Sequence, residues 1–244
     1  MTEQPHVAVV GGGVAGLSAA TFTARAGLPT TLISTGESIL NRNAHIENFP
    51  GFPAGVNPRL LLEMTREQAR RAGVAFEEAR IERVTKADGA GPFELESDSE
   101  RWSAAYVVAA SWSDPSYLAD LDVELVDRGS KTFVGVAAFG ETDIDGLYAA
   151  GRLAEKHHQA IVAAGHGAQV GLAVVEDSDV EFYHDWTVPE GYFTERGREV
   201  PPGCEEIDEA ERQRREAESL ERMRAAFAEP HPDEPTMHPS VADE

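Results

Sequence analysis

Cysteine is almost absent from this sequence. Among 244 residues only Cys204 carries a thiol, and it lies in the segment PPGC, where we expect a loop. One chain therefore holds neither an internal disulfide nor a Cys-x-x-Cys redox pair. The histidines and the cysteine show no zinc-type spacing, and no G-x-S-x-G motif marks a serine nucleophile. We therefore expect no metal site and no dithiol within the chain.

Basic side chains are scarce, and lysine is the scarcest. The chain has 43 acidic and 21 basic residues, a formal charge of −22, and only Lys86, Lys131 and Lys156 as lysines. Such a surface repels nucleic acid and anionic membranes, so we expect neither as a partner. Excess carboxylate with little lysine is typical of a high-salt cytoplasm, where screening over roughly 3 Å at 1 M salt removes self-repulsion. An ordinary acidic protein is the alternative.

Long apolar runs are also missing. No stretch approaches the roughly 20 apolar residues that a membrane span needs. Residues 1–6 are polar, and the apolar run after them is too short and glycine-rich for a signal peptide. The sequence predicts a soluble cytoplasmic protein.

The remaining pattern predicts an α/β fold with a parallel sheet, helices, a small antiparallel β element and a C-terminal charged helix. Residues 1–176 form the expected main domain, followed by an aromatic and proline-rich extension at 177–204, a charged helix at 205–228 and a disordered tail at 229–244. The expected strands are 7–10, 30–34, 74–84, 93–97, 106–110, 132–138 and 147–150, with a turn at 87–92. The expected helices are 17–26, 57–72 and 160–175.

A glycine-rich turn joins the first strand to the first helix. Gly11, Gly13 and Gly16 fit G-x-G-x-x-G, with Val14 and Ala15 between the last two glycines. The first glycine permits the tight turn, the second lets the backbone approach a pyrophosphate, and the third lets the helix pack closely on the strand. Helix N–H groups then face the phosphates, which predicts a dinucleotide site. A glycine-rich turn without a ligand is the alternative.

An acidic residue is expected after the second strand to bond the adenosine ribose. Thr35, Gly36 and Glu37 occupy this region, so Glu37 is the candidate. A surface glutamate in a loop is the alternative.

Further motifs follow in a fixed order. Residues 46–53 read IENFPGFP, residues 146–151 read GLYAAG, and residues 158–167 read HQAIVAAGHG. With the glycine turn they extend over about residues 7–175 and resemble the FAD domain of thioredoxin reductase, which is split in sequence and joined in space. The resemblance implies a Rossmann-like FAD-binding fold, with FAD as the cofactor.

The resemblance also assigns roles to individual residues. It places the glycine turn at the pyrophosphate, Asn48 near the flavin, and Gln159 and Ala160 at the flavin's pyrimidine edge, where a helix N-terminus stabilises the anionic reduced flavin. The cofactor-binding residues that follow are Gly11, Gly13, Val14, Ala15, Gly16, Glu37, Asn48, Gly151, Arg152, Gln159 and Ala160.

The chain departs from the family pattern at several places, one of which is Ile39-Leu40 in place of the usual G-G-Q-L segment. Arg152 stands where family members have an aspartate that bonds the ribityl chain, so Arg152 either binds a phosphate or neutralises acidic neighbours. Ala109, Ala110 and Ser111 replace an A-T-G motif. Family members also insert an NADPH domain with a Cys-x-x-Cys pair after that motif, but the roughly 20 residues of 111–131 are fewer than the 50 a domain needs. Thioredoxin reduction is therefore not expected.

The sequence leaves three hypotheses. The leading one is a FAD-dependent oxidoreductase that depends on an external electron donor or acceptor, such as a soluble reductase, a ferredoxin or free reduced nicotinamide. The second is a degenerate nucleotide-binding fold that serves as a non-catalytic binding or regulatory module. The third is a nicotinamide dinucleotide in the glycine-rich site. We also consider a homodimer, because the charged helix has a thin apolar stripe.

Overall fold

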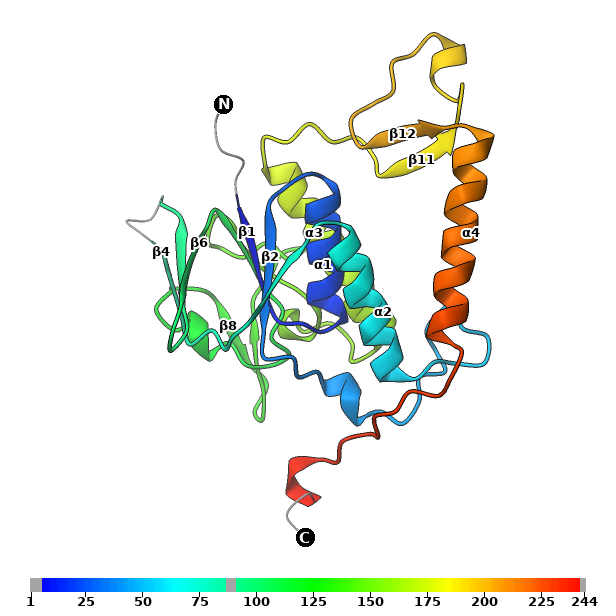
Figure 1. The fold of residues 1–244 in the computed structure, drawn as a ribbon. Coiled ribbons are helices and arrows are strands. Elements are labelled where there is room, and N and C mark those ends of the chain that lie inside the picture. The colour runs from blue at the N-terminus through cyan, green and yellow to red at the C-terminus, as the bar shows by residue number, and fades with distance from the viewer. Residues whose placement is uncertain (1–5, 87–90, 242–244) are drawn as a thin grey trace.

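A parallel sheet forms the centre of the computed structural model, which describes residues 6–86 and 91–241. Its strand order is β10-β7-β1-β2-β3, and every neighbouring pair is parallel (Figure 1). These strands are β1 (Val7–Val10), β2 (Thr30–Ser34), β3 (Ala75–Glu78), β7 (Tyr106–Ala109) and β10 (Leu147–Ala149). In the central register, Val7 lies between Thr30 and Tyr106. The predicted fold class is confirmed.

Helices cover one face of this sheet. They are α1 (Val14–Arg25), α2 (Pro58–Arg71) and α3 (Ala160–Asp177). Val7 and Val9 of β1 point to this face and pack with Leu17 of α1 and Val170 of α3. Alternate side chains of each central strand thus enter the helical layer.

A smaller antiparallel sheet covers the other face (Figure 1). It consists of β4 (Arg83–Lys86), β5 (Phe93–Glu96) and β6 (Arg101–Ala104), and β8 (Leu125–Asp127) pairs with β9 (Thr132–Val134) beside it. Ala8 and Val10 point to this face and share a core with Phe93 and Leu95, which are fully buried. Both faces of β1 are therefore buried, which explains its continuous apolar sequence.

Helices α1 and α3 lie against each other at glycines. A Cβ atom on Gly167 of α3 would fall 2.0 Å from the carbonyl oxygen of Ala15, and one on Gly171 would fall 2.7 Å from that of Ala19. Only glycine leaves room for backbones this close. The contact joins two segments far apart in sequence and brings their N-termini to one end of the sheet.

The structure corrects the expected strand at residues 74–84. The chain forms β3 in the parallel sheet, leaves it after Glu78, and then forms β4 in the antiparallel sheet. The Ala79 N–H still bonds the Ser34 carbonyl, whereas the Glu82 N–H bonds the Glu96 carbonyl, so the change of partner falls between them. Most of the turn expected at 87–92 lies outside the described residues.

Beyond α3 the chain forms an extension above the helical layer. It contains the parallel pair β11 (Trp186–Pro189) and β12 (Cys204–Ile207), followed by α4 (Glu209–Ala226). Cys204 is therefore the first residue of a strand rather than part of a loop. Helix α4 has no buried residue, and Leu220, Met223 and Phe227 of its apolar stripe stay exposed among the described residues.

Short 3-10 helices fill several connections. They are η1 (Ile39–Arg42), η3 (Ser116–Leu118), η4 (Gly151–Ala154), η5 (Thr194–Arg196) and η6 (Pro239–Val241). No helix in the two described ranges is long and apolar enough to cross a membrane. η1, η3 and η4 border the candidate site.

Candidate functional site

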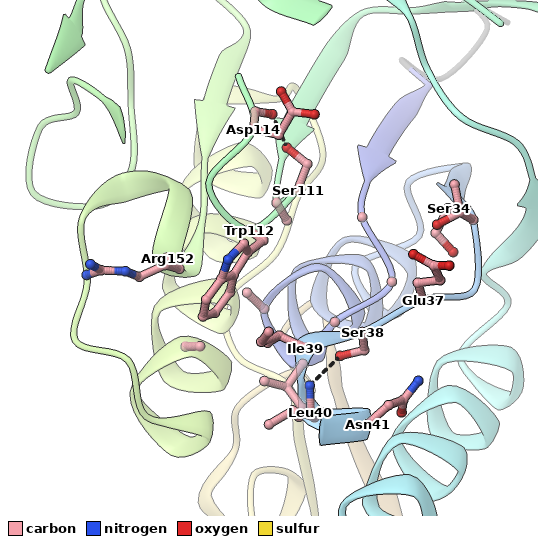
Figure 2. A pocket seen from close by; sticks show the side chains of 18 of the residues that line it. Ser34, Glu37, Ser38, Ile39, Leu40, Asn41, Ser111, Trp112, Asp114 and Arg152 are labelled. Atoms are coloured by element: carbon pink, nitrogen blue, oxygen red, sulfur yellow. Dashed lines mark hydrogen bonds between the residues drawn. The ribbon is translucent and has the colours of Figure 1, made fainter. Parts of the chain in front are cut away.

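A cavity of about 630 Å³ lies at the carboxyl ends of β1, β2 and β7 (Figure 2). Ligands of open α/β sheets bind at this edge. The predicted site residues that line it are Gly11, Gly13, Val14, Ala15, Glu37, Arg152, Gln159 and Ala160. Gly16, Asn48 and Gly151 are not part of this lining, but they lie next to Gly11, Gln159 and Ala15, respectively.

The glycine turn has three different steric requirements. Gly11 has φ of 120°, and a Cβ there would lie 2.4 Å from the Ala110 carbonyl oxygen, at the end of β7. A Cβ on Gly16 would lie 2.0 Å from the Gly11 carbonyl oxygen. Gly13 differs, because the nearest atom to its Cβ position is the Ser38 Oγ at 3.9 Å. Gly11 and Gly16 are therefore required by packing, while the space at Gly13 opens into the cavity.

Two helix N-termini face this cavity without side-chain caps. Gly13 precedes α1 and Gln159 precedes α3; neither side chain bonds the first turn, and neither first turn contains an acidic residue. In contrast, α2 and α4 are capped by the side chains of Asn57 and Asp208. Free N–H groups and the positive end of the helix dipole favour anions. The cavity thus has two places that favour negative charge.

The segment after β2 forms the next wall. Glu37 is exposed at the rim, and Ser38 Oγ accepts a hydrogen bond from the Leu40 N–H at 3.3 Å (Figure 2). Arg59 of α2 is buried and donates from Nη1 to the carbonyls of Asn41 and Asn43 at 3.1 and 3.0 Å. This guanidinium fixes η1 against α2, and with it the position of the wall.

Asn48 connects the loop after η1 to the start of α3. Its Nδ2 donates to Gln159 Oε1 at 2.7 Å, although 111 residues separate the two. Gln159 and Ala160 line the cavity, so Asn48 acts on the site by orienting Gln159. The structure thus places these residues from two distant motifs together.

Gly151 is held by a buried histidine. The Gly151 N–H donates to His166 Nδ1 at 3.0 Å, and the ring's Nε2 has no partner in the described structure. With Nδ1 as an acceptor, the neutral ring carries its proton on Nε2. Burial, with a smaller contribution from Lys156, lowers the pKa of His166 to about 4, while Glu141 opposes the shift. The imidazole is therefore neutral in the folded protein at pH 7.

Stability should consequently fall as the pH drops from about 6.5 toward 4. In that interval the unfolded chain binds a proton at His166 and the folded chain does not, so acid favours unfolding. We expect His166 to account for a loss on the order of 2 kcal/mol. Urea unfolding of wild-type protein and His166→Gln at several pH values measures it. The glutamine variant should lose less stability in this interval, and equal slopes would contradict the assignment.

Arg152 lines the cavity but directs its guanidinium elsewhere. Figure 2 shows the side chain extending away from Trp112 and from the Ser38 side of the site. Its guanidinium carbon lies 4.7 Å from the centre of the Phe133 ring, and Nη1 donates to the Lys156 carbonyl at 3.0 Å. In this arrangement the arginine packs on the protein rather than reaching the glycine turn. A role in phosphate binding would require another rotamer.

Sequence reasoning did not assign several lining residues. Trp112 has φ of 64°, an uncommon conformation for a bulky side chain, and contacts the His158 ring at a centroid distance of 4.4 Å. Burial, then Lys131 and Arg152, lower the pKa of His158. Thr236 and Met237 also line the cavity, from the far end of the chain. Trp112 was detectable as a residue just past the carboxyl end of a core strand, whereas Thr236 and Met237 had no local signal.

Nothing in the described ranges indicates a metal centre. No three His, Cys, Asp or Glu side chains there are grouped so that they could hold an ion. The available chemistry at the cavity is instead anion binding by helix ends, ribose binding by a carboxylate, and shielding by apolar and aromatic side chains.

Comparison with known proteins identifies the first part of this site. The model of the FAD binding domain family matches residues 6–45, which include the glycine turn and Glu37. The bifunctional thioredoxin reductase/thioredoxin of Mycobacterium leprae is 35% identical over 130 residues, covering 51% of this chain and 28% of that protein. The thioredoxin reductase of Aquifex aeolicus is 38% identical over 87 residues, covering 33% and 27%.

Solved structures share the fold over more of the chain. A thioredoxin reductase from Gloeobacter violaceus superposes with a TM-score of 0.63 at 17% identity, covering 75% of this chain and 100% of that one. A ferredoxin-flavin thioredoxin reductase from Clostridium acetobutylicum gives 0.59 at 15% identity, covering 72% and 98%. The curated relatives are matched over only 24% to 36% of their own length.

The residues present fit FAD. The cavity has open space at Gly13 for a pyrophosphate, uncapped helix ends for negative charge at two places, and Glu37 at the rim. The comparisons thus support a thioredoxin-reductase-like FAD-dependent oxidoreductase family for this chain, which is similar to the curated relatives over about a quarter to a third of their length.

Proposed function

We propose that this protein is a FAD-dependent oxidoreductase that exchanges electrons with an external donor or acceptor. The observation that carries the proposal is the pair of uncapped helix N-termini at one cavity. When bound, FAD supplies reversible two-electron chemistry. Every other part of the function depends on how this chain holds the cofactor and exposes it.

In this proposal, different residues along the cavity bind different parts of FAD. The N–H groups of the first turn of α1 bind the pyrophosphate, and Glu37 accepts from the ribose hydroxyls. The first turn of α3 stabilises negative charge at the pyrimidine edge, with Gln159 oriented by Asn48. Trp112 and His158 cover the opposite side and limit the access of water.

Two features of the chain support an external partner. Cys204 is the sole cysteine of the sequence, so the chain contains no dithiol. Between β7 and β10 the described chain contains only η3, β8 and β9, which is too little for a second nucleotide domain. These two features support the proposal that electrons enter and leave through a separate molecule, such as a soluble reductase, a ferredoxin or free reduced nicotinamide.

Anaerobic titration of the FAD-loaded protein with dithionite tests this proposal. We expect two electron equivalents per chain, because FAD is the sole redox group, followed by reoxidation when an external acceptor such as ferricyanide is added. Uptake of four equivalents would reveal a second redox centre. A flavin that cannot be reduced, or that an external acceptor cannot reoxidise, would contradict electron exchange. Chain lacking FAD serves as the control.

A non-catalytic binding or regulatory module is the second candidate. Arg152 replaces a carboxylate and packs on Phe133, and Leu220, Met223 and Phe227 leave an apolar surface on α4 exposed. This candidate does not bind FAD, so FAD should leave its melting temperature unchanged. A ligand that binds only the folded state would raise the melting temperature. This candidate would be favoured by a stable partner, or a second copy of the chain, that no longer binds when Leu220 is replaced by a charged residue.

A further inference from the structure

The C-terminal segment reaches the cofactor cavity. The segment, residues 229–241, leaves the end of α4, contacts α2 at His231, meets η1 at Thr236 and then extends away from the body of the protein (Figure 1). The sequence predicts disorder for 229–244, because the segment is polar and rich in proline. In the structure His231 and Thr236 instead contact the body of the protein, and residues 242–244 lie outside the described range.

The start of this segment is anchored on the loop that carries Asn48. At the end of α4 the Phe227 ring lies 6.1 Å from that of Phe52, which in turn lies 6.0 Å from Phe49. Next, His231 Nε2 lies 3.1 Å from Glu63 Oε1 of α2. The His231 side chain is only 4% exposed, so this contact is packed as well as polar. These contacts hold the segment against the side of the site.

The far part of the segment contacts the cavity wall itself. The Thr236 N–H donates to the Asn41 carbonyl at 3.0 Å, and Arg59 Nη1 donates to the same oxygen. Thr236 and Met237 line the cavity together with η1. The segment therefore shares a hydrogen-bond acceptor with the arginine that fixes η1.

The prolines of this segment reduce the number of contacts that are needed to hold it in place. Pro230, Pro232, Pro235 and Pro239 each fix one backbone φ angle before the segment is ordered. Ordering then costs less conformational entropy than it would in a flexible tail. A small set of contacts can thus hold the segment in place, and it can still be released.

We propose that residues 229–241 form a strap that closes the FAD site and slows release of the cofactor. The proposal of a strap depends on FAD binding, which the proposed function also requires. Thr236 and Met237 supply part of the wall, while His231 holds the strap on α2. The cofactor enters when the strap is released and is retained when it closes.

Full-length variants with single changes in the strap test the proposal. His231→Ala removes the anchor on α2, and Thr236→Pro removes the N–H donor to Asn41. The matched control is His238→Ala, because His238 is exposed and its ring hydrogen-bonds Ser240 of the same segment. The measurements are the rate of FAD release, followed by the recovery of flavin fluorescence after dilution, and the melting temperature of the FAD-free protein.

We expect release to accelerate roughly tenfold in His231→Ala and Thr236→Pro and to stay unchanged in His238→Ala. The melting temperature without FAD should be the same in all of them, because the strap acts on the cofactor and not on the core. Equal release rates in wild-type protein and both strap variants would overturn the strap alone. Wild-type protein that takes up no FAD would overturn the cofactor assignment and the strap together.

Discussion

Gly13→Ala should weaken FAD binding by roughly 10- to 100-fold while the protein without cofactor stays folded. The nearest atom to the new Cβ is Ser38 Oγ at 3.9 Å, so the apoprotein accommodates the methyl group. The same methyl group occupies space that the pyrophosphate needs at the start of α1. Since alanine is a poorer N-cap than glycine, a loss of less than about 1 kcal/mol in unfolding free energy is also expected. Quenching of FAD fluorescence measures the dissociation constant.

Gly16→Ala provides the contrast for this experiment. Its Cβ would lie 2.0 Å from the Gly11 carbonyl oxygen, so it should destabilise the protein whether or not FAD is present. Within one motif, the substitution at Gly13 therefore tests FAD binding and the substitution at Gly16 tests stability. Unchanged FAD affinity in Gly13→Ala would contradict the placement of the pyrophosphate at α1.

Gly167→Ala should lower the free energy of unfolding by about 3 kcal/mol or more. The added Cβ would lie 2.0 Å from the Ala15 carbonyl oxygen and also contact the Ala15 Cα, and backbone atoms cannot move away as a flexible side chain can. Helices α1 and α3 must therefore separate, which also displaces the two N-termini at the cavity. Urea unfolding measures the loss, and FAD affinity should fall with it.

Gly165→Ala is the matched control, because it lies in the same helix two residues earlier. No heavy atom lies within 4 Å of its Cβ position. Alanine in a helix interior should leave stability unchanged or raise it by up to about 1 kcal/mol. If the two substitutions had equal effects, the close contact of α1 with α3 would not be the cause.

The sequence was sufficient to predict the core of the fold. Residues 7–10 and 30–34 are short apolar runs joined by a glycine turn and a helix, and β1 and β2 have these bounds in the structure. The glycine turn lies at the cavity for the same local reason, since its spacing fixes both the turn and the start of α1. Glu37, Gln159 and Ala160 also line the cavity, because each stands next to the end of a strand or the start of a helix.

Features that depend on distant contacts could not be predicted in this way. Arg152 was identifiable as an unusual residue, but its packing on Phe133 is set by a strand elsewhere in the chain. The change of sheet after Glu78 depends on which strand offers the next carbonyl. The Thr236 N–H bonds the carbonyl of Asn41, which lies 195 positions earlier in the sequence, whereas composition alone favoured disorder there. Pattern and spacing describe local structure, whereas these features arise from tertiary contacts.

The visible absorption spectrum of protein purified in molar salt, with the released cofactor identified by mass, tests the central claim most directly. A flavin band and one FAD released per chain on denaturation is the predicted result. A colourless protein that also takes up no added FAD would contradict it, because the cavity with its two uncapped helix ends would then hold some other ligand or none.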